Sequence, residues 1–110
     1  MRKISSNYTF LPSLPLLKYA YVTLGDVVEC VDTRGIMKEI SQLEFYAGLL
    51  VADYVVEYMD VFVVGETFID KIEQIYLQNQ NREFSRLALI EGADLLNFKW
   101  SQNTSVRIFS

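Results

Sequence analysis

Histidine is absent from the 110 residues of this chain. Its absence removes the side chain that most often acts as a general acid or base near neutral pH, and the commonest ligand of transition metals. A Ser-His-Asp triad or a Cys-His pair therefore cannot be assembled from this chain alone. These exclusions favour a protein without catalytic residues, although the sequence leaves open whether the chain is an enzyme.

Cysteine occurs once, at Cys30, so no disulfide can form within the chain. A chain without disulfides is typical of a reducing compartment, and we expect a cytoplasmic protein. The acidic residues Glu29 and Asp32 lie close to Cys30 in the sequence. Because neighbouring negative charge raises the pKa of a thiol, we expect Cys30 to be structural rather than nucleophilic.

Basic stripes and uninterrupted apolar runs are missing too. The net charge is −4, and residues 26–60 contain eight acidic and two basic residues, which gives this segment a charge of −6. A segment so acidic repels nucleic acid, and we expect no nucleic-acid partner. The apolar residues 45–64 contain Asp53, Glu57 and Asp60, each costing about 2.5–3.5 kcal/mol near the centre of a bilayer, so we expect no membrane span.

Apolar material is abundant, with 51% hydrophobic and 14% aromatic residues. The segment Ile36–Asp60 predicts one long helix with two opposite apolar faces. We expect the first face to supply the core, and it consists of Ile36, Ile40, Leu43, Ala47, Leu50, Val51, Tyr54 and Tyr58. The second face consists of Phe45, Leu49, Ala52, Val56 and Met59. Because a chain of this length has little material to bury both faces, the second face predicts contact with another chain.

Shorter elements surround the predicted helix. Strands are predicted at Tyr8–Leu11, Lys18–Leu24, Val27–Asp32, Val61–Val64, Arg86–Ile90, Asp94–Trp100 and Ser105–Phe109. A second helix is predicted after Thr67, because Thr67 and Asp70 form a capping box. The order predicts a single α+β domain, residues 1–110, in which one long central helix and a shorter helix pack on a mostly antiparallel sheet. An all-α fold is the alternative, because residues 19–32 and 83–96 are also compatible with helices.

Carboxylates are the only catalytic groups present in quantity. Asp53, Glu57 and Asp60 lie about one turn apart on the predicted helix, a pattern that suits Mg²⁺ or Ca²⁺ binding or an acid–base pair. A solvated polar seam is the simpler interpretation, so we expect no metal site, no cofactor and no catalytic residue. Arg82 and Arg86 are expected to pair with this seam, within one chain or between chains.

Two functions are compatible with these patterns. The first is a non-enzymatic protein–protein interaction module, a small subunit, inhibitor or adaptor that is oligomeric or binds a protein partner. Its predicted partner-binding residues are Phe45, Leu49, Asp53, Val56, Glu57 and Met59. The alternative is a small-ligand-binding domain or a carboxylate-dependent enzyme, with an aromatic-lined pocket in a cupped α+β fold.

Overall fold

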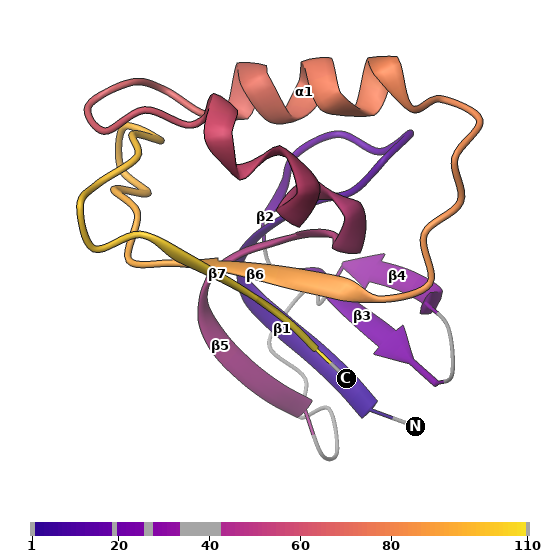
Figure 1. Ribbon diagram of the computed structural model, residues 1–110. Helices are drawn as coiled ribbons and strands as arrows, with labels where there is room; N and C mark the ends of the chain where they lie inside the picture. The colour runs from indigo at the N-terminus through magenta and orange to yellow at the C-terminus, as the bar shows by residue number, and fades with distance from the viewer. Residues whose placement is uncertain (1, 19, 26–27, 34–42, 110) are drawn as a thin grey trace.

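A computed structural model describes residues 2–18, 20–25, 28–33 and 43–109 of the protein (Figure 1). In chain order the elements are β1 (Arg2–Phe10), β2 (Leu17–Lys18), β3 (Ala20–Leu24), β4 (Val28–Thr33), β5 (Leu43–Ala52), the 3-10 helix η1 (Asp53–Val61), α1 (Ile69–Gln78), β6 (Leu87–Glu91) and β7 (Ser105–Ile108). The strands form one curved sheet, and α1 lies across one of its faces with η1 beside it (Figure 1).

The sheet has seven strands in the order β4-β3-β1-β5-β6-β7, with β2 also paired to β1. Only β1 and β5 are parallel, and the other pairs are antiparallel. The α+β class and the mostly antiparallel sheet are therefore confirmed, and the all-α alternative is wrong. The β3–β4 pair, the helix that follows Thr67 and the strands β6 and β7 also agree with the sequence analysis.

The predicted long helix Ile36–Asp60 is wrong over its described part. Leu43–Ala52 is the strand β5, and Asp53–Val61 is 3-10 helix with a kink at Tyr58. Residues 34–42 lie outside the described residues. The four consecutive residues of Leu49–Ala52 are all buried, because both faces of the sheet are covered at this point. An apolar run that is buried on both faces has no strand periodicity, so it resembles the side of a buried helix.

Two further predicted strands are wrong. Val63 and Val64 lie in a turn after η1, with both side chains exposed. Asp94–Trp100 is a loop that makes only isolated bridges from Lys99 to Thr67 and to Asp94. Both segments are rich in apolar residues, but backbone hydrogen bonds join the loop after Val64 to the loop that ends at Trp100 rather than joining either to the sheet.

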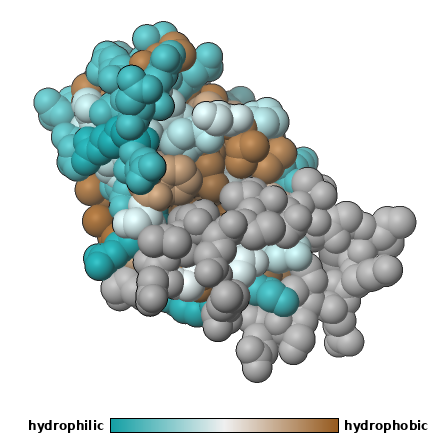
Figure 2. All heavy atoms as spheres, turned by 90° about the vertical axis from the view of Figure 1, so that its right-hand side faces the viewer, coloured by the Kyte–Doolittle hydropathy of each residue, from teal (hydrophilic) through white to brown (hydrophobic). Residues whose placement is uncertain are grey.

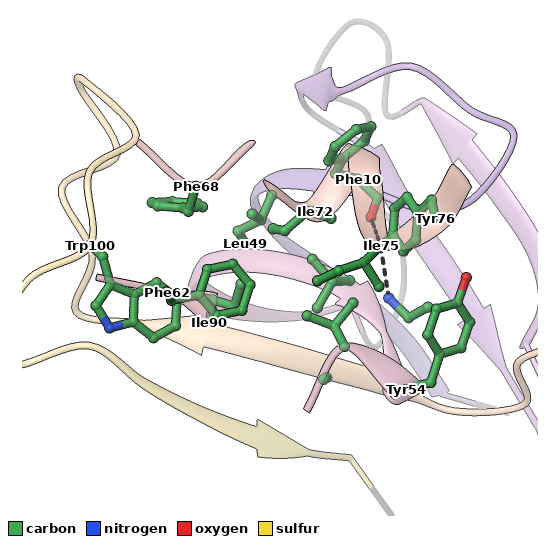
Figure 3. Packing of buried hydrophobic residues seen from close by; sticks show 14 residues of the cluster. Phe10, Leu49, Tyr54, Phe62, Phe68, Ile72, Ile75, Tyr76, Ile90 and Trp100 are labelled. Atoms are coloured by element: carbon green, nitrogen blue, oxygen red, sulfur yellow. Dashed lines mark hydrogen bonds between the residues drawn. The ribbon is translucent and has the colours of Figure 1, made fainter. Parts of the chain in front are cut away.

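The core consists of two clusters on opposite faces of the sheet. The cluster under α1 includes Phe68, Ile72 and Tyr76 together with Leu49 and Ile90 from the sheet (Figure 3). The cluster on the other face consists of Ile4, Leu11, Val22, Leu24, Leu50, Leu87, Leu89 and Phe109. Because most of its members come from β1, β3, β5 and β6, the sheet curls around them.

The predicted core face of the long helix is confirmed at some positions only. Leu50, Val51 and Tyr54 are buried, as expected. Leu43 is half-buried, and Ala47 is exposed. Ile36 and Ile40 lie outside the described residues. The strand geometry explains the mixture, because successive residues of β5 point to opposite faces of the sheet.

An ion pair joins the neighbouring ends of the parallel strands β1 and β5. Arg2 donates from Nε and Nη2 to the two carboxylate oxygens of Glu44, both at 2.9 Å, and the Tyr46 hydroxyl donates to Glu44 Oε1 at 2.8 Å. These hydrogen bonds, those from Arg2 above all, lower the pKa of Glu44 from 4.5 to about 2. The carboxylate of the folded protein is therefore ionised at neutral and mildly acidic pH.

We expect Glu44→Gln to lower the free energy of unfolding at pH 7 by about 0.5–1 kcal/mol, since solvent screens a pair whose side chains are 39% and 35% exposed. The folded-state pKa lies below the ordinary value, so the contribution is complete above about pH 4.5 and is lost as the pH falls toward 2. Urea unfolding of both proteins at pH 7 and pH 2 measures this difference. An equal loss at the two pH values would contradict the assignment.

Candidate functional site

A groove of about 670 Å³ lies between the loop after β1 and the helix α1. The loop contributes Phe10, Leu11, Pro12, Ser13, Leu14, Pro15 and Leu16, and the helical side contributes Ile69, Glu73, Tyr76, Leu77, Gln80 and Asn81. The side of the molecule at which α1 ends exposes hydrophobic residues among hydrophilic ones (Figure 2). Most of the lining is apolar, which is typical of a binding site.

The loop wall of the groove is held in a defined shape by its sequence. Pro12 and Pro15, the only prolines of the chain, both belong to it, and each fixes its own backbone φ. Between them Ser13 has a φ of 67°, in the left-handed region that residues other than glycine rarely adopt. A strained residue between two prolines is typical of a preformed binding loop.

The floor of the groove is fixed by Tyr76. Its hydroxyl donates to the carbonyl oxygen of Phe10 at 2.5 Å and accepts from the backbone N–H of Ala52 at 3.1 Å. Burial raises the pKa of Tyr76 above its ordinary value of 10, so the phenol stays neutral. One side chain of α1 thereby ties the groove to the ends of β1 and β5.

The chemistry of the groove suits binding rather than catalysis. Among the described residues that line it, Glu73 is the only charged one. The other polar groups are the Ser13 hydroxyl, the Tyr76 phenol and the amides of Gln80 and Asn81. A single carboxylate against an apolar surface favours a ligand that carries apolar groups and one positive charge.

A second, smaller hollow of about 360 Å³ lies beside η1. It is lined by Asp53, Tyr54, Val56, Glu57, Arg82, Glu83, Ser85, Arg86 and Ile108. A third hollow connects it with the groove, sharing Pro12, Ser13 and Gln80 with the groove and Arg82, Glu83 and Ser85 with the hollow beside η1. The three hollows therefore form one band along the surface.

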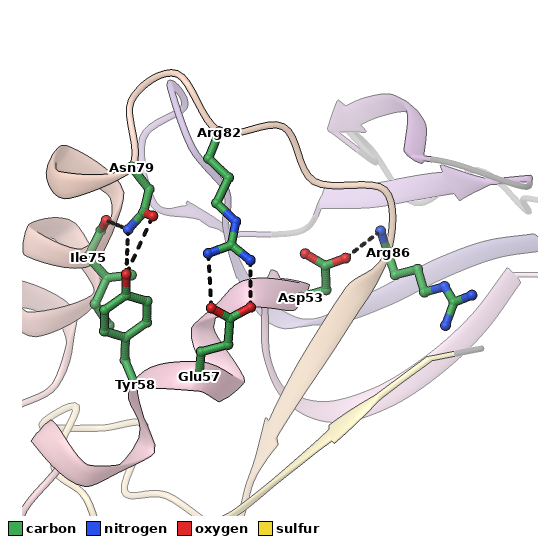
Figure 4. Close-up of polar contacts among 7 residues, drawn as sticks. All are labelled: Asp53, Glu57, Tyr58, Ile75, Asn79, Arg82 and Arg86. Atoms are coloured by element: carbon green, nitrogen blue, oxygen red, sulfur yellow. Dashed lines mark hydrogen bonds and ion pairs between the residues drawn. The ribbon is translucent and has the colours of Figure 1, made fainter.

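One ion pair and one backbone contact hold charged groups in the hollow beside η1 (Figure 4). Arg82 donates to both carboxylate oxygens of Glu57, at 3.0 and 2.5 Å, and these hydrogen bonds lower the pKa of Glu57. Asp53 accepts from the backbone N–H of Arg86 at 3.2 Å, and its own N–H donates to the Arg86 carbonyl. The expectation that Arg82 pairs with the predicted acidic seam within the chain is confirmed.

The six predicted partner-binding residues do not share one helix face. Phe45 and Leu49 lie on β5, and Leu49 is 0% exposed, whereas Phe45 is 52% exposed. Asp53, Val56 and Glu57 lie together on η1 and line the smaller hollow. Met59 is half-buried against the core cluster under α1. Whether any of these residues binds a partner stays a prediction.

The sequence analysis did not identify the groove. Its walls come from residues 10–16 and 69–81, which are far apart in the sequence, and no local pattern joins them. The one available signal is the position of both prolines within four residues of each other. That signal indicates a rigid loop but does not identify the helix that faces it.

The expectations of no metal site and no membrane span can be compared with the structure only for the described residues. Within the described ranges, no group of three or more acidic, cysteine or histidine side chains is placed to hold a metal ion. No helix among the described residues is long and apolar enough to cross a bilayer. Cys30 belongs to β4, where its side chain is not described, so its structural role stays a prediction.

The chain was also compared with known proteins. Neither a scan of protein-family models nor searches of curated proteins and of solved structures found a match. The function of this chain must therefore be inferred from the geometry and chemistry of the groove and of the hollow beside η1.

Proposed function

We propose that this protein is a non-enzymatic interaction module that holds an apolar segment of a protein partner in the groove between the 11–16 loop and α1. The observation that carries the proposal is the groove itself, a hollow of about 670 Å³ that is apolar in most of its lining. A well-formed groove with an apolar lining and a few polar groups is the usual hypothesis for a binding site.

Preorganisation supports the proposal. The two prolines and the hydrogen bonds of Tyr76 restrict the groove before a partner arrives, so little conformational entropy is lost on binding. Leu14 and Leu77 are both exposed, on opposite sides of the groove. Apolar side chains at these positions lose contact with water only when a partner covers them.

The lining also defines the chemistry of the partner segment. Apolar anchors fit against Leu14, Leu77 and Ile69, and one Lys or Arg fits beside Glu73. An amphipathic helix carries such anchors at positions i, i+3 and i+4 on one face. We therefore propose a short amphipathic segment with one basic residue as the occupant.

A pair of leucine variants tests this proposal. The probe is a capped amphipathic peptide with leucines on one face and a single central lysine, titrated into the labelled protein by NMR. We expect amide shifts in residues 11–16 and in α1, and we expect Leu77→Asp to weaken binding at least about tenfold, about 1.4 kcal/mol. The matched control is Leu96→Asp, since Leu96 is 88% exposed and lies outside the groove.

The charge of the probe gives a second readout. A peptide in which glutamate replaces the lysine should bind more weakly, and Glu73→Gln should reduce that difference. Binding that survives Leu77→Asp, or that shifts residues outside the groove, would refute the proposal. A peptide that does not bind at all would refute it too.

A small apolar amine is the second candidate occupant, because about 670 Å³ lies within the range of small-molecule pockets, about 300–1,000 Å³. It corresponds to the alternative function from the sequence. Titration with an alkylamine distinguishes the two: tight binding of the amine, with no gain from the peptide, favours the small ligand. Self-association stays a prediction, which size-exclusion chromatography with light scattering measures.

A further inference from the structure

The strand β7 ends the sheet in the described part of the chain (Figure 1). It pairs with β6 alone, with Ala88 opposite Ile108 and Ile90 opposite Val106. An end strand presents unpaired backbone N–H and C=O groups to any further strand. Four residues, Ser105–Ile108, form this edge.

The backbone groups that face outward can be assigned from the hydrogen bonds to β6. Phe109 donates its N–H to the Leu87 carbonyl at 2.9 Å, so Phe109 faces inward. In an antiparallel ladder, inward and outward residues alternate. Arg107 therefore also faces β6, and the N–H and C=O groups of Val106 and Ile108 face the open edge.

The hollow beside η1 adjoins this edge. Ile108 is part of its lining and, with Val56, forms its apolar part. The residue of an added strand that lies directly opposite Ile108 points to the same face of the sheet. Its side chain therefore lies on the side of the hollow, as a specificity pocket requires.

The charges of the hollow are not balanced. Three carboxylates and two guanidinium groups line it, and Arg82 and Glu57 pair with each other. Glu83 and the Arg86 side chain form no ion pair within the described part of the chain. Asp53 and Glu83 therefore outweigh Arg86, and the hollow carries a net negative charge.

We propose that the open edge of β7 accepts an extended segment of a protein partner as an additional antiparallel strand. Alternate side chains of the added strand point to the face of the sheet on which η1 lies. One of them is apolar and packs against Ile108 and Val56. Another is a lysine or arginine that lies near Asp53 and Glu83. Backbone hydrogen bonds to Val106 and Ile108 hold the strand, and the hollow selects its sequence. This surface shares no lining residue with the groove, and the inference does not depend on the proposed function.

A second copy of the chain fits this edge poorly. Two edge strands can bond only through residues whose backbone N–H and C=O groups face the open edge. A copy of β7 therefore aligns Val106 either with Ile108 or with Val106 of the other chain. The first register places Arg107 directly opposite its own copy, where like charges are destabilising. The second register loses bonds, because it sets Ile108 opposite Thr104, whose N–H already donates to the Ser101 carbonyl.

Peptide titration followed by NMR tests the proposal on the intact chain. The probe is a capped peptide in which threonine alternates with apolar residues. A lysine replaces one of the apolar residues, so that it points to the same face as the others. We expect shifts at the amides of Val106 and Ile108 and at Val56. Glutamate in place of the lysine should weaken binding several-fold, and a peptide N-methylated on its edge-facing amides should not bind.

Two variants of Ile108 separate the backbone from the side chain. Ile108→Pro removes the outward N–H, which an edge strand tolerates, and should weaken binding about tenfold beyond the effect of Ile108→Ala, which keeps the N–H. Glu83→Gln should remove part of the preference for lysine. The N-methylated peptide gives the same information without altering the protein.

The proposal is overturned by any of three results. The first is an absence of peptide-induced shifts on β7, and the second is equal binding of the N-methylated or the glutamate peptide. The third is a set of shifts at Val106 and Ile108 that grows with protein concentration alone, because a second copy would then occupy the edge.

Discussion

Replacing Leu49 with aspartate is expected to unfold the protein at room temperature. Leu49 is 0% exposed and belongs to the core cluster under α1, so the new carboxylate would be buried among apolar side chains. Burying an unpaired charge, together with the loss of the leucine contacts, costs more than about 4 kcal/mol. Small domains are stable by only about 5–15 kcal/mol, so most of the stability is lost. Circular dichroism and urea unfolding measure the effect.

The matched control lies four residues earlier on the same strand. Phe45 is 52% exposed, and Phe45→Asp should cost about 1 kcal/mol or less. Both residues belonged to the face that the sequence assigned to a partner. A Leu49→Asp protein that stays folded while its oligomer dissociates would restore that assignment. If Leu49→Asp unfolds and Phe45→Asp stays folded, Leu49 belongs to the core and not to a partner surface.

The segment around Leu49 also explains why the long helix was predicted in error. A run of buried apolar residues shows neither the period of a helix nor that of a strand. The length of the run is then the only criterion left for choosing between the two, and it favoured a helix. The segment becomes a strand through partners that are distant in sequence: Leu49 lies opposite Tyr8 on β1 and opposite Ile90 on β6. Long-range pairing of this kind overrides local preference and leaves no trace in the local pattern.

Elements defined by local signals were predicted well. The helix α1 begins at Ile69, close to the predicted start after Thr67, but the capping box itself is wrong: Phe68 is the N-cap residue, no side chain caps the helix, and Thr67 Oγ1 donates to Asp70 Oδ1 at 3.2 Å. The pair β3–β4 follows from two runs rich in valine and tyrosine on either side of Gly25. In these cases the residues that determine the structure are neighbours in the sequence, so a single sequence is sufficient.

Of the two candidate sites, one contact was predictable from the sequence and the groove was not. The pairing of Arg82 with Glu57 was predictable from charge and from the helical spacing of the acids, although the helix itself was wrong. The groove was not predictable, because its shape depends on the loop 11–16 meeting α1 across more than fifty residues of chain. Loop conformation and helix placement are tertiary properties, which composition and periodicity do not encode.

Gly48→Ala is expected to destabilise the protein strongly. Gly48 lies in β5 with a φ of 143°, which side chains rarely adopt, and a Cβ atom there would lie 2.3 Å from the Ile90 carbonyl oxygen. Its N–H donates to Asn7 Oδ1 at 2.9 Å, where β1 has a bulge between Ser6 and Tyr8. An added methyl group must therefore separate β5 from β6 or undo the bulge, and we expect a loss of about 3 kcal/mol or more.

Gly65→Ala separates steric contact from backbone strain. Gly65 has a φ of 88°, and nothing lies within 4 Å of a Cβ atom at that position. Its alanine variant bears only the cost of a left-handed backbone, about 1–2 kcal/mol. Urea unfolding of both variants should therefore show a larger loss for Gly48→Ala, because the Ile90 carbonyl belongs to the sheet backbone and cannot move alone. Equal losses would mean that β5 and β6 separate at little cost, and the pairing of Leu49 with Ile90 would then not be a rigid part of the core.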